Sequence, residues 1–106
     1  MAKFLVQGSY TAEGLKGVMK DKAAGRIAAV KKAAASVGGK VDAVYWALGE
    51  DDVICILDVP DAESAAALSL AVGVSGLVRI RTTRLLTADE VDAAIGKVVN
   101  YRAPGK

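Results

Sequence analysis

Two arginines in the second half of the chain are the side chains best suited to hold a small anion. Arg79 and Arg81 alternate with Val78 and Ile80, so on a strand the two arginines share one face and the aliphatic side chains share the other. A guanidinium group holds a carboxylate or a phosphate through two parallel hydrogen bonds. The same arginines can instead form ion pairs between subunits or discourage further pairing at a sheet edge. We treat Arg79 and Arg81 as candidate ligand-binding residues.

The aromatic side chains form a second candidate group. Tyr10, Tyr45 and Trp46 are most of the aromatic residues in a chain with three Tyr, one Trp and one Phe. They are suited to line a small cavity, either between a sheet and its helices or between subunits. The alternative interpretation is that they are ordinary core or interface residues. Together with the two arginines, they predict a site for a small anionic or aromatic molecule.

Several kinds of chemistry are disfavoured by composition. The chain has no His and one Cys, which leaves no Ser-His-Asp or Cys-His arrangement and no zinc site with several cysteines. Glu50, Asp51 and Asp52 are adjacent carboxylates, but they match no calcium-loop spacing and are interpreted as a solvated hairpin turn. The glycines match no phosphate-binding or dinucleotide motif. We therefore predict no metal ion, no cofactor and no catalytic residue.

A nucleic-acid partner is also disfavoured. The formal charge is +2, too small to indicate such a partner by itself. The basic side chains of residues 16–26 are interpreted as a solvated helical face. RNA-recognition modules share the strand order derived below, but they stack bases on aromatic residues of the central strands, and Val53–Val59 has none.

The elements that must position these residues follow from hydrophobic periodicity, capping residues and turns. Helical segments up to Lys20 and from Lys22 form either one kinked helix or two helices at an angle. The predicted order is a strand at Lys3–Tyr10, helices at Thr11–Lys20 and Lys22–Val37, strands at Val41–Leu48 and Val53–Val59, a helix from the Asp61 cap to Ser75, a strand at Leu77–Leu85, a helix from Thr87 to Val99, and a loose tail at Asn100–Lys106.

This order is β-α-β-β-α-β followed by one more helix. It predicts an α+β, ferredoxin-like fold in which an antiparallel sheet carries its helices on one face. The length of 106 residues fits a single domain, which we place at residues 1–99.

The face of the sheet without helices should be polar, yet Val53–Leu57 is apolar at every position. Leaving such a face in water would forgo several kcal/mol, at about 25 cal/mol per Å² of apolar surface. We expect a second copy of the chain to pack on this face, sheet to sheet. The alternative is that the last helix folds back over it.

Three stretches resemble the GYD-domain family of small bacterial and archaeal proteins. They are Phe4–Gly17, the region from Gly38-Gly39 through Tyr45–Glu50, and Val78–Thr87. The name-giving Gly-Glu-Tyr-Asp stretch reads Gly49-Glu50-Asp51-Asp52 in this chain, so Asp51 replaces its tyrosine. The resemblance implies a ferredoxin-like protein of the dimeric α+β-barrel type, and it implies no particular activity.

The function expected from these observations is binding or structural. The protein would be a homo-oligomer that holds any ligand at the subunit interface, through Tyr10, Tyr45, Trp46, Arg79 and Arg81. One alternative is a cofactor-free isomerase or oxygenase, which would need an acid or base such as Glu50, Asp52 or Lys16 in a pocket. Another is a small-molecule sensor. The absence of a signal-peptide pattern or membrane span, together with the unpaired Cys55, predicts a cytoplasmic protein without a membrane partner.

Overall fold

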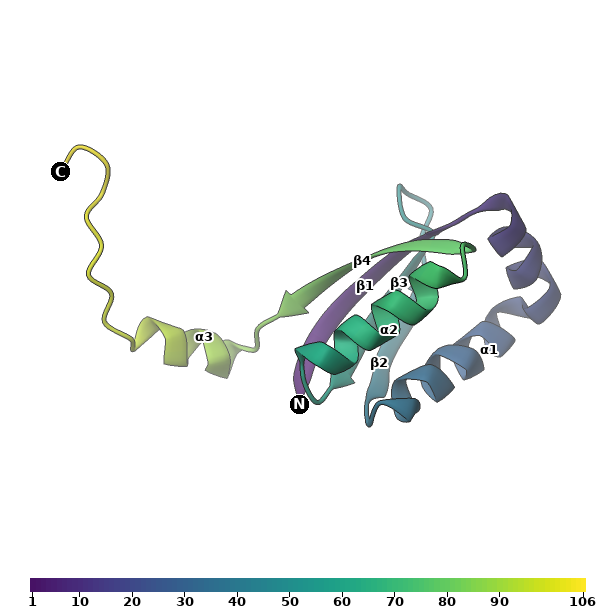
Figure 1. Ribbon diagram of the computed structural model, residues 1–106, viewed down its shortest axis with the longest axis horizontal. Coiled ribbons are helices and arrows are strands. Elements are labelled where there is room, and N and C mark those ends of the chain that lie inside the picture. Colours follow the sequence, from purple (N-terminus) through teal and green to yellow (C-terminus); the bar gives the residue numbers. More distant parts are fainter.

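The computed structural model describes all residues from Met1 to Lys106 and has the predicted order of elements (Figure 1). The elements are β1 (Ala2–Tyr10), α1 (Ala12–Ser36), β2 (Lys40–Trp46), β3 (Val53–Val59), α2 (Ala62–Val74), β4 (Val78–Leu85) and α3 (Ala88–Ile95). The four strands form one antiparallel sheet in the order β2-β3-β1-β4. The ferredoxin-like fold predicted from the sequence is therefore confirmed.

Helices α1 and α2 lie on one face of the sheet, and the core lies between (Figure 1). Phe4 on β1 pairs with Leu57 on β3, and Val6 pairs with Cys55. Since side chains alternate between the two faces of a strand, these residues share the face that the helices cover. The buried cluster consists of Phe4, Cys55, Leu57, Val59 and Ala65.

The helical segments before and after Lys22 meet at a kink within α1, where the backbone is not helical. Lys22 has φ 63° and ψ 170°, inside α1. This backbone conformation is rare for any residue with a side chain and carries a strain of about 1–3 kcal/mol. The strained residue redirects the helix, so its second half runs back along the sheet (Figure 1).

The last helix is shorter than predicted. α3 ends at Ile95 with Gly96 as its C-cap, whereas the apolar spacing predicted a helix to Val99. Glycine disfavours helix by about 1 kcal/mol relative to alanine, and residues 97–99 gain no packing that would compensate, because they are exposed.

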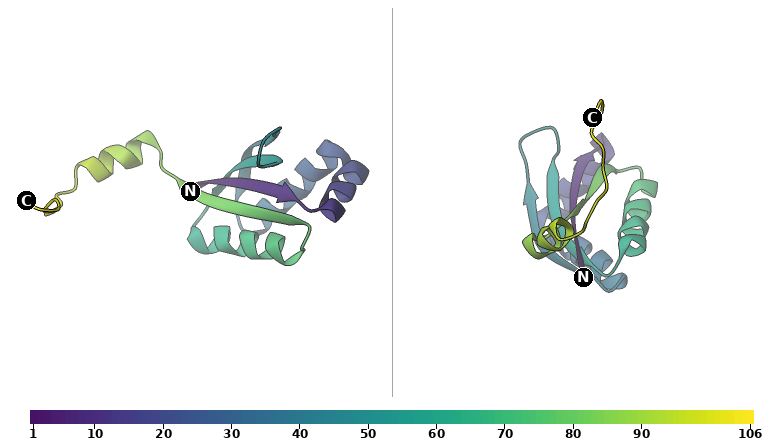
Figure 2. Two further views of the ribbon diagram at one scale, coloured as in Figure 1. Left: turned by 90° about the horizontal axis from the view of Figure 1, so that it is seen from above. Right: turned by 90° about the vertical axis from the view of Figure 1, so that its left-hand side faces the viewer.

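The position of α3 excludes, for the single chain, the alternative that the last helix covers the open face of the sheet. α3 does not fold back over the sheet; it stands beyond the end of β4 and points away from the other elements (Figure 2). The molecule is consequently elongated, with extents of 57 × 32 × 23 Å. None of the helices combines the length and the apolar character that a membrane span requires.

Candidate functional site

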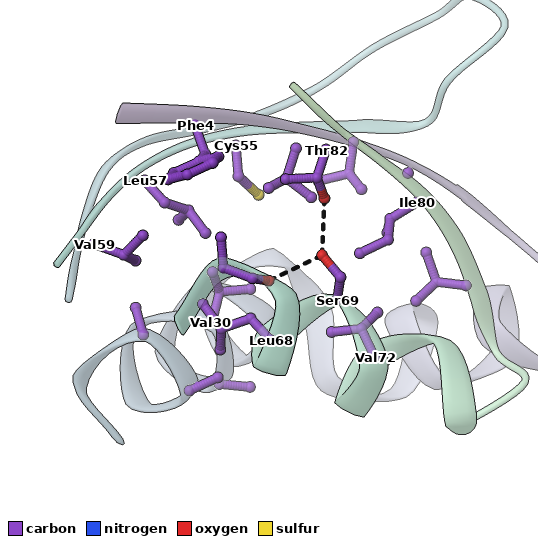
Figure 3. Close-up of a pocket in the computed structure, with 18 of the residues that line it drawn as sticks. Phe4, Val30, Cys55, Leu57, Val59, Leu68, Ser69, Val72, Ile80 and Thr82 are labelled. Atoms are coloured by element: carbon purple, nitrogen blue, oxygen red, sulfur yellow. Dashed lines mark hydrogen bonds between the residues drawn. The ribbon is translucent and has the colours of Figure 1, made fainter. Parts of the chain in front are cut away.

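An apolar cavity lies between the sheet and helices α1 and α2. Its volume is about 150 Å³, and 16 of the 20 residues that line it are hydrophobic. Phe4, Cys55 and Leu57 line it from the sheet, Val30 from α1, and Leu68 from α2 (Figure 3). The cavity exists because alanines occupy helix positions that face the sheet. These are Ala29, Ala33, Ala34 and Ala65.

The few polar groups of the wall are mostly satisfied. The Ser69 hydroxyl donates to the carbonyl oxygen of Ala65 at 3.0 Å, and its oxygen lies 2.9 Å from the Thr82 hydroxyl (Figure 3). With Ser69 donating to the backbone, Thr82 is left as the donor of the second bond. Both hydroxyl groups already donate a hydrogen bond within the protein, so this wall offers a ligand no free hydroxyl donor.

One charged side chain, Arg26, also lines the cavity. Its guanidinium lies 3.5 Å from the Asp21 carboxylate, and the pair spans the kink at Lys22. Both side chains are partly exposed, at 35% and 46%, so solvent weakens the pair. Arg26 is therefore available to meet a polar or anionic group on a molecule in the cavity.

The Cys55 thiol lines the same cavity but is not set up as a nucleophile. The residue is 7% exposed, and burial raises the pKa of its thiol. The thiolate is the reactive form, and no titratable group lowers this pKa. Cys55 acts as a small apolar lining residue.

The open face of the sheet carries a polar cluster around Asp51. The Asp51 carboxylate accepts hydrogen bonds from Arg81 at 2.5 Å, Gln7 at 3.3 Å and Ser9 at 3.4 Å. Asp52 accepts from the backbone N–H of Tyr10 at 2.9 Å. The β2–β3 loop is thus fastened to β1, and these two carboxylates do not form the freely solvated turn that the sequence indicated.

A second polar cluster lies at the opposite end of the open face. The Lys3 ammonium donates to Asp42 at 2.6 Å and to Asp58 at 3.4 Å. Asp58 is 9% exposed, and its second carboxylate oxygen has no hydrogen-bond partner. The hydrogen bond to Asp42 is the main reason why the pKa of Lys3 is raised.

Between the two clusters the open face is apolar. Leu5 pairs with Ile56, and the next β3 residue on this face is Ile54, opposite Tyr45 of β2. Leu5, Ile54 and Ile56 are partly exposed in the single chain. We call these three residues the apolar strip.

The five predicted site residues do not converge on one point. Tyr10 lines the cavity. Trp46 pairs with Val53, on the helix-covered face, but it does not line the cavity. Tyr45 is 69% exposed on the other face, and Arg79 and Arg81 lie across the sheet on β4, two strands from β3.

The acids and bases considered for catalysis are not among the cavity residues either. Glu50, Asp52 and Lys16 do not line it. The structure also has no group of three or more His, Cys, Asp or Glu side chains that could hold a metal ion.

A cavity between the sheet and its helices was one of the two places expected for the aromatic residues, but its aliphatic lining was not predicted, and Arg26 was assigned to a solvated helical face. The relevant signal was the small size of the residues on the helix faces that pack against large residues of β1 and β3. Alanine opposite Phe4 and Leu57 leaves space, whereas a periodicity argument counts alanine and leucine alike as apolar.

Comparison with known proteins gives one match. No curated protein and no solved structure matches this chain. The family model described as the GYD domain matches residues 4–95, from within β1 to the end of α3. The chain therefore belongs to the GYD-domain family.

Proposed function

We propose that this GYD-domain protein binds a small, mainly apolar molecule and works as a homo-oligomer. The observation that carries the proposal is the cavity, which is apolar, partly open and lined from both helices and three strands. It contains none of the carboxylates or lysines that an acid–base enzyme would need, so binding is the function it supports best.

The size of the cavity indicates the size of the ligand. A volume of about 150 Å³ matches that of an enclosed apolar cavity that takes up benzene, so a ligand of about that size would fit here. Because Arg26 also lines this cavity, a single aromatic ring bearing a polar or anionic substituent would fit its chemistry. This is the class of small anionic or aromatic molecule expected from the sequence, with Tyr10 as the shared residue.

The apolar strip supports association between copies. Leu5, Ile54 and Ile56 keep part of their surface in water in the single chain, and burying it against another chain would contribute about 25 cal/mol per Å². Tyr45, Arg79 and Arg81 lie on the same open face. Any ligand held by these three residues would then lie at a subunit interface.

Binding can be tested with indole as the probe. We expect indole to raise the melting temperature of the protein in a concentration-dependent way, because a ligand that binds only the folded state stabilises it. Filling the cavity by Val30→Phe should abolish this shift. Val74→Phe is the matched control, since Val74 is 85% exposed on α2 and does not line the cavity.

Native mass spectrometry of the same protein reports both subunit number and any retained molecule. An indole shift that persists in Val30→Phe would contradict binding in the cavity. A monomer at every concentration would contradict association and would leave the cavity result standing.

A further inference from the structure

The C-terminal segment contributes no residue to the cavity or to the apolar strip. We define the arm as residues 86–106, which begins after β4 and includes α3. We propose that the arm of each chain docks across the apolar strip of a second copy, so that two chains exchange arms. This inference rests on the proposed association and names the segment that mediates it.

The arm carries several large apolar side chains that are exposed to solvent. Ile95 is 75% exposed, Val98 93%, Val99 77% and Tyr101 74%. Large apolar side chains scattered singly over a surface need no explanation, but a contiguous run marks an interaction surface. Within the chain nothing covers this run, because the arm stands away from the rest of the molecule (Figure 2).

Four apolar residues of the arm have the spacing of one helix face. Val91, Ile95, Val98 and Val99 stand at positions i, i+4, i+7 and i+8, the spacing of an apolar helical stripe. The structure has helix only to Ile95, so half of the stripe lies in a segment that is not helical. We expect residues 96–99 to become helical when a partner surface supports them.

The base of the arm is held in a way that directs it outward. Arg84 donates to Glu90 at 2.8 Å, and its guanidinium lies 5.6 Å from the centre of the Phe4 ring. Thr87 and Glu90 form a capping box. Only Leu86 and Thr87 separate β4 from α3, so these contacts leave little freedom for α3 to turn back over its own sheet.

A helix of this length nevertheless needs a partner. Isolated helices shorter than about 12–15 residues are marginal in water even when they are rich in alanine. α3 has 8 residues. The caps determine where it begins, and burial of its stripe must supply the remaining stability.

The apolar strip of a second copy fits this stripe in size. From Val91 to Val99 a helix rises about 12 Å, at 1.5 Å per residue. Four strands that are about 4.8 Å apart span about 14 Å. A docked arm that crosses the strands would therefore cover Leu5, Ile54 and Ile56 together.

Charge also agrees with this placement. Asp89 and Asp92 on α3 make no ion pair in the single chain, and neither does Arg79 on the open face. Docking the acidic start of α3 near β4 of the partner would bring these opposite charges together. Because each chain has one arm and one strip, mutual exchange gives a closed two-fold dimer.

The test uses two full-length variants and their mixture. The arm variant carries Val91→Asp and Ile95→Asp, and the strip variant carries Ile54→Asp. Leu70→Asp is the control, since Leu70 is 69% exposed on α2, away from both surfaces. Mass is measured by light scattering over a range of concentrations, and circular dichroism checks that each variant is folded.

We expect the wild type and the control to be dimers, and each of the two variants to dissociate with a Kd raised about 100-fold or more, as for buried interface anchors. Mixing the two variants should restore a dimer, because the intact arm of the strip variant can dock on the intact strip of the arm variant. If the arm variant stays dimeric while the strip variant is monomeric, the sheets pack directly and the arm proposal is wrong. A wild type that is monomeric at every concentration overturns association as well.

Hydrogen exchange of the wild type gives a second reading that depends on no variant. Amides of residues 91–99 should exchange more slowly at concentrations where the dimer forms than at concentrations where it dissociates. Equal exchange at both concentrations, in a protein shown to dimerise, would overturn the arm proposal while leaving the dimer intact.

Discussion

Helices α2 and α3 differ in their capping residues and in their burial, and the comparison shows what each of the two determines. α2 has a simple Asp61 cap and apolar residues on nearly all sides, and it packs on the sheet through buried Ala65. α3 has the fuller local signal, a complete capping box and two acids in its first turn, yet none of its residues is buried. Caps determine where a helix begins, whereas burial determines where it lies.

The same difference separates the body of the protein, residues 2–85, from the arm. The body is joined by antiparallel pairing of all four strands and by the cluster around Phe4. The arm is joined to it by Arg84 and a short connection. We therefore expect substitutions in the body to change the stability of the single chain, and substitutions in the arm to change its local helix and its association.

Removing one aromatic ring from the body and one from the arm should give the largest difference in the free energy of unfolding. Phe4 is 6% exposed, so Phe4→Ala should lower the free energy of unfolding by about 3–5 kcal/mol. Tyr101 is 74% exposed, and Tyr101→Ala should change the stability of the single chain by less than about 0.5 kcal/mol. Urea unfolding of the dilute protein measures both. Equal losses in the two variants would contradict the division into body and arm.

A smaller difference in stability is expected when one methyl group is added to a glycine of the body and to a glycine of the arm. A Cβ at Gly14 would lie 2.0 Å from the carbonyl oxygen of Leu77. Gly14→Ala must therefore displace the start of α1 and should cost about 1–3 kcal/mol, as overpacking does. At Gly96 the nearest atom to an added Cβ is the carbonyl oxygen of Ala93, at 3.5 Å, an ordinary contact.

Gly96→Ala should accordingly leave urea unfolding of the body unchanged and increase the helical signal of the arm, because alanine favours helix by about 1 kcal/mol. Gly17→Ala is a control within α1, since nothing lies within 4 Å of its added Cβ. A loss of stability in Gly17→Ala as large as in Gly14→Ala would show that the close approach to Leu77 is not the cause.

The smallest expected effect is a pH dependence confined to the arm. The backbone N–H of Thr87 and the Arg84 guanidinium lower the pKa of Glu90. A carboxylate with a lowered pKa stabilises the folded form above its unfolded pKa of about 4.3, and this contribution is lost as the pH falls through the lower folded value. Helix in α3 should therefore decrease below about pH 4.

NMR chemical shifts of residues 88–95 measure this change separately from the body. Glu90→Gln keeps the acceptor for the Thr87 N–H but has no carboxyl to titrate. Its arm should show little change over the same pH range. A transition of equal size in this variant would assign the effect to other carboxylates.

Much of the fold was predictable because its signals are local. The apolar run Val53–Val59 marks β3 without error at either end, and Asp61 and Thr87 cap the helices that follow them. The change of direction near Lys22 was predicted, because both alternatives drawn from the weak helix before it contain a break there. The end of α3 was not predictable, since the stripe continues to Val99 while the helix stops at Gly96 for lack of a surface to bury it.

The candidate site was less predictable because it depends on contacts between distant segments. Asp51 looked like a solvated turn residue until pairing of β1 with β3 brought Gln7 and Ser9 beside it and β4 brought Arg81. Tyr10 and Tyr45 were grouped by residue type, although they lie on opposite faces of the sheet.

The sequence by itself determined the order of the elements, the helix starts and the two-sided apolar strands, since each depends on residues close together in the chain. Only the tertiary structure decided that alanines facing Phe4 and Leu57 leave a cavity, and that the arm stands away from the sheet. The physical reason is that a cavity and an unpartnered surface are properties of the space between elements. That space depends on how side chains of different sizes meet, which periodicity along one segment does not record.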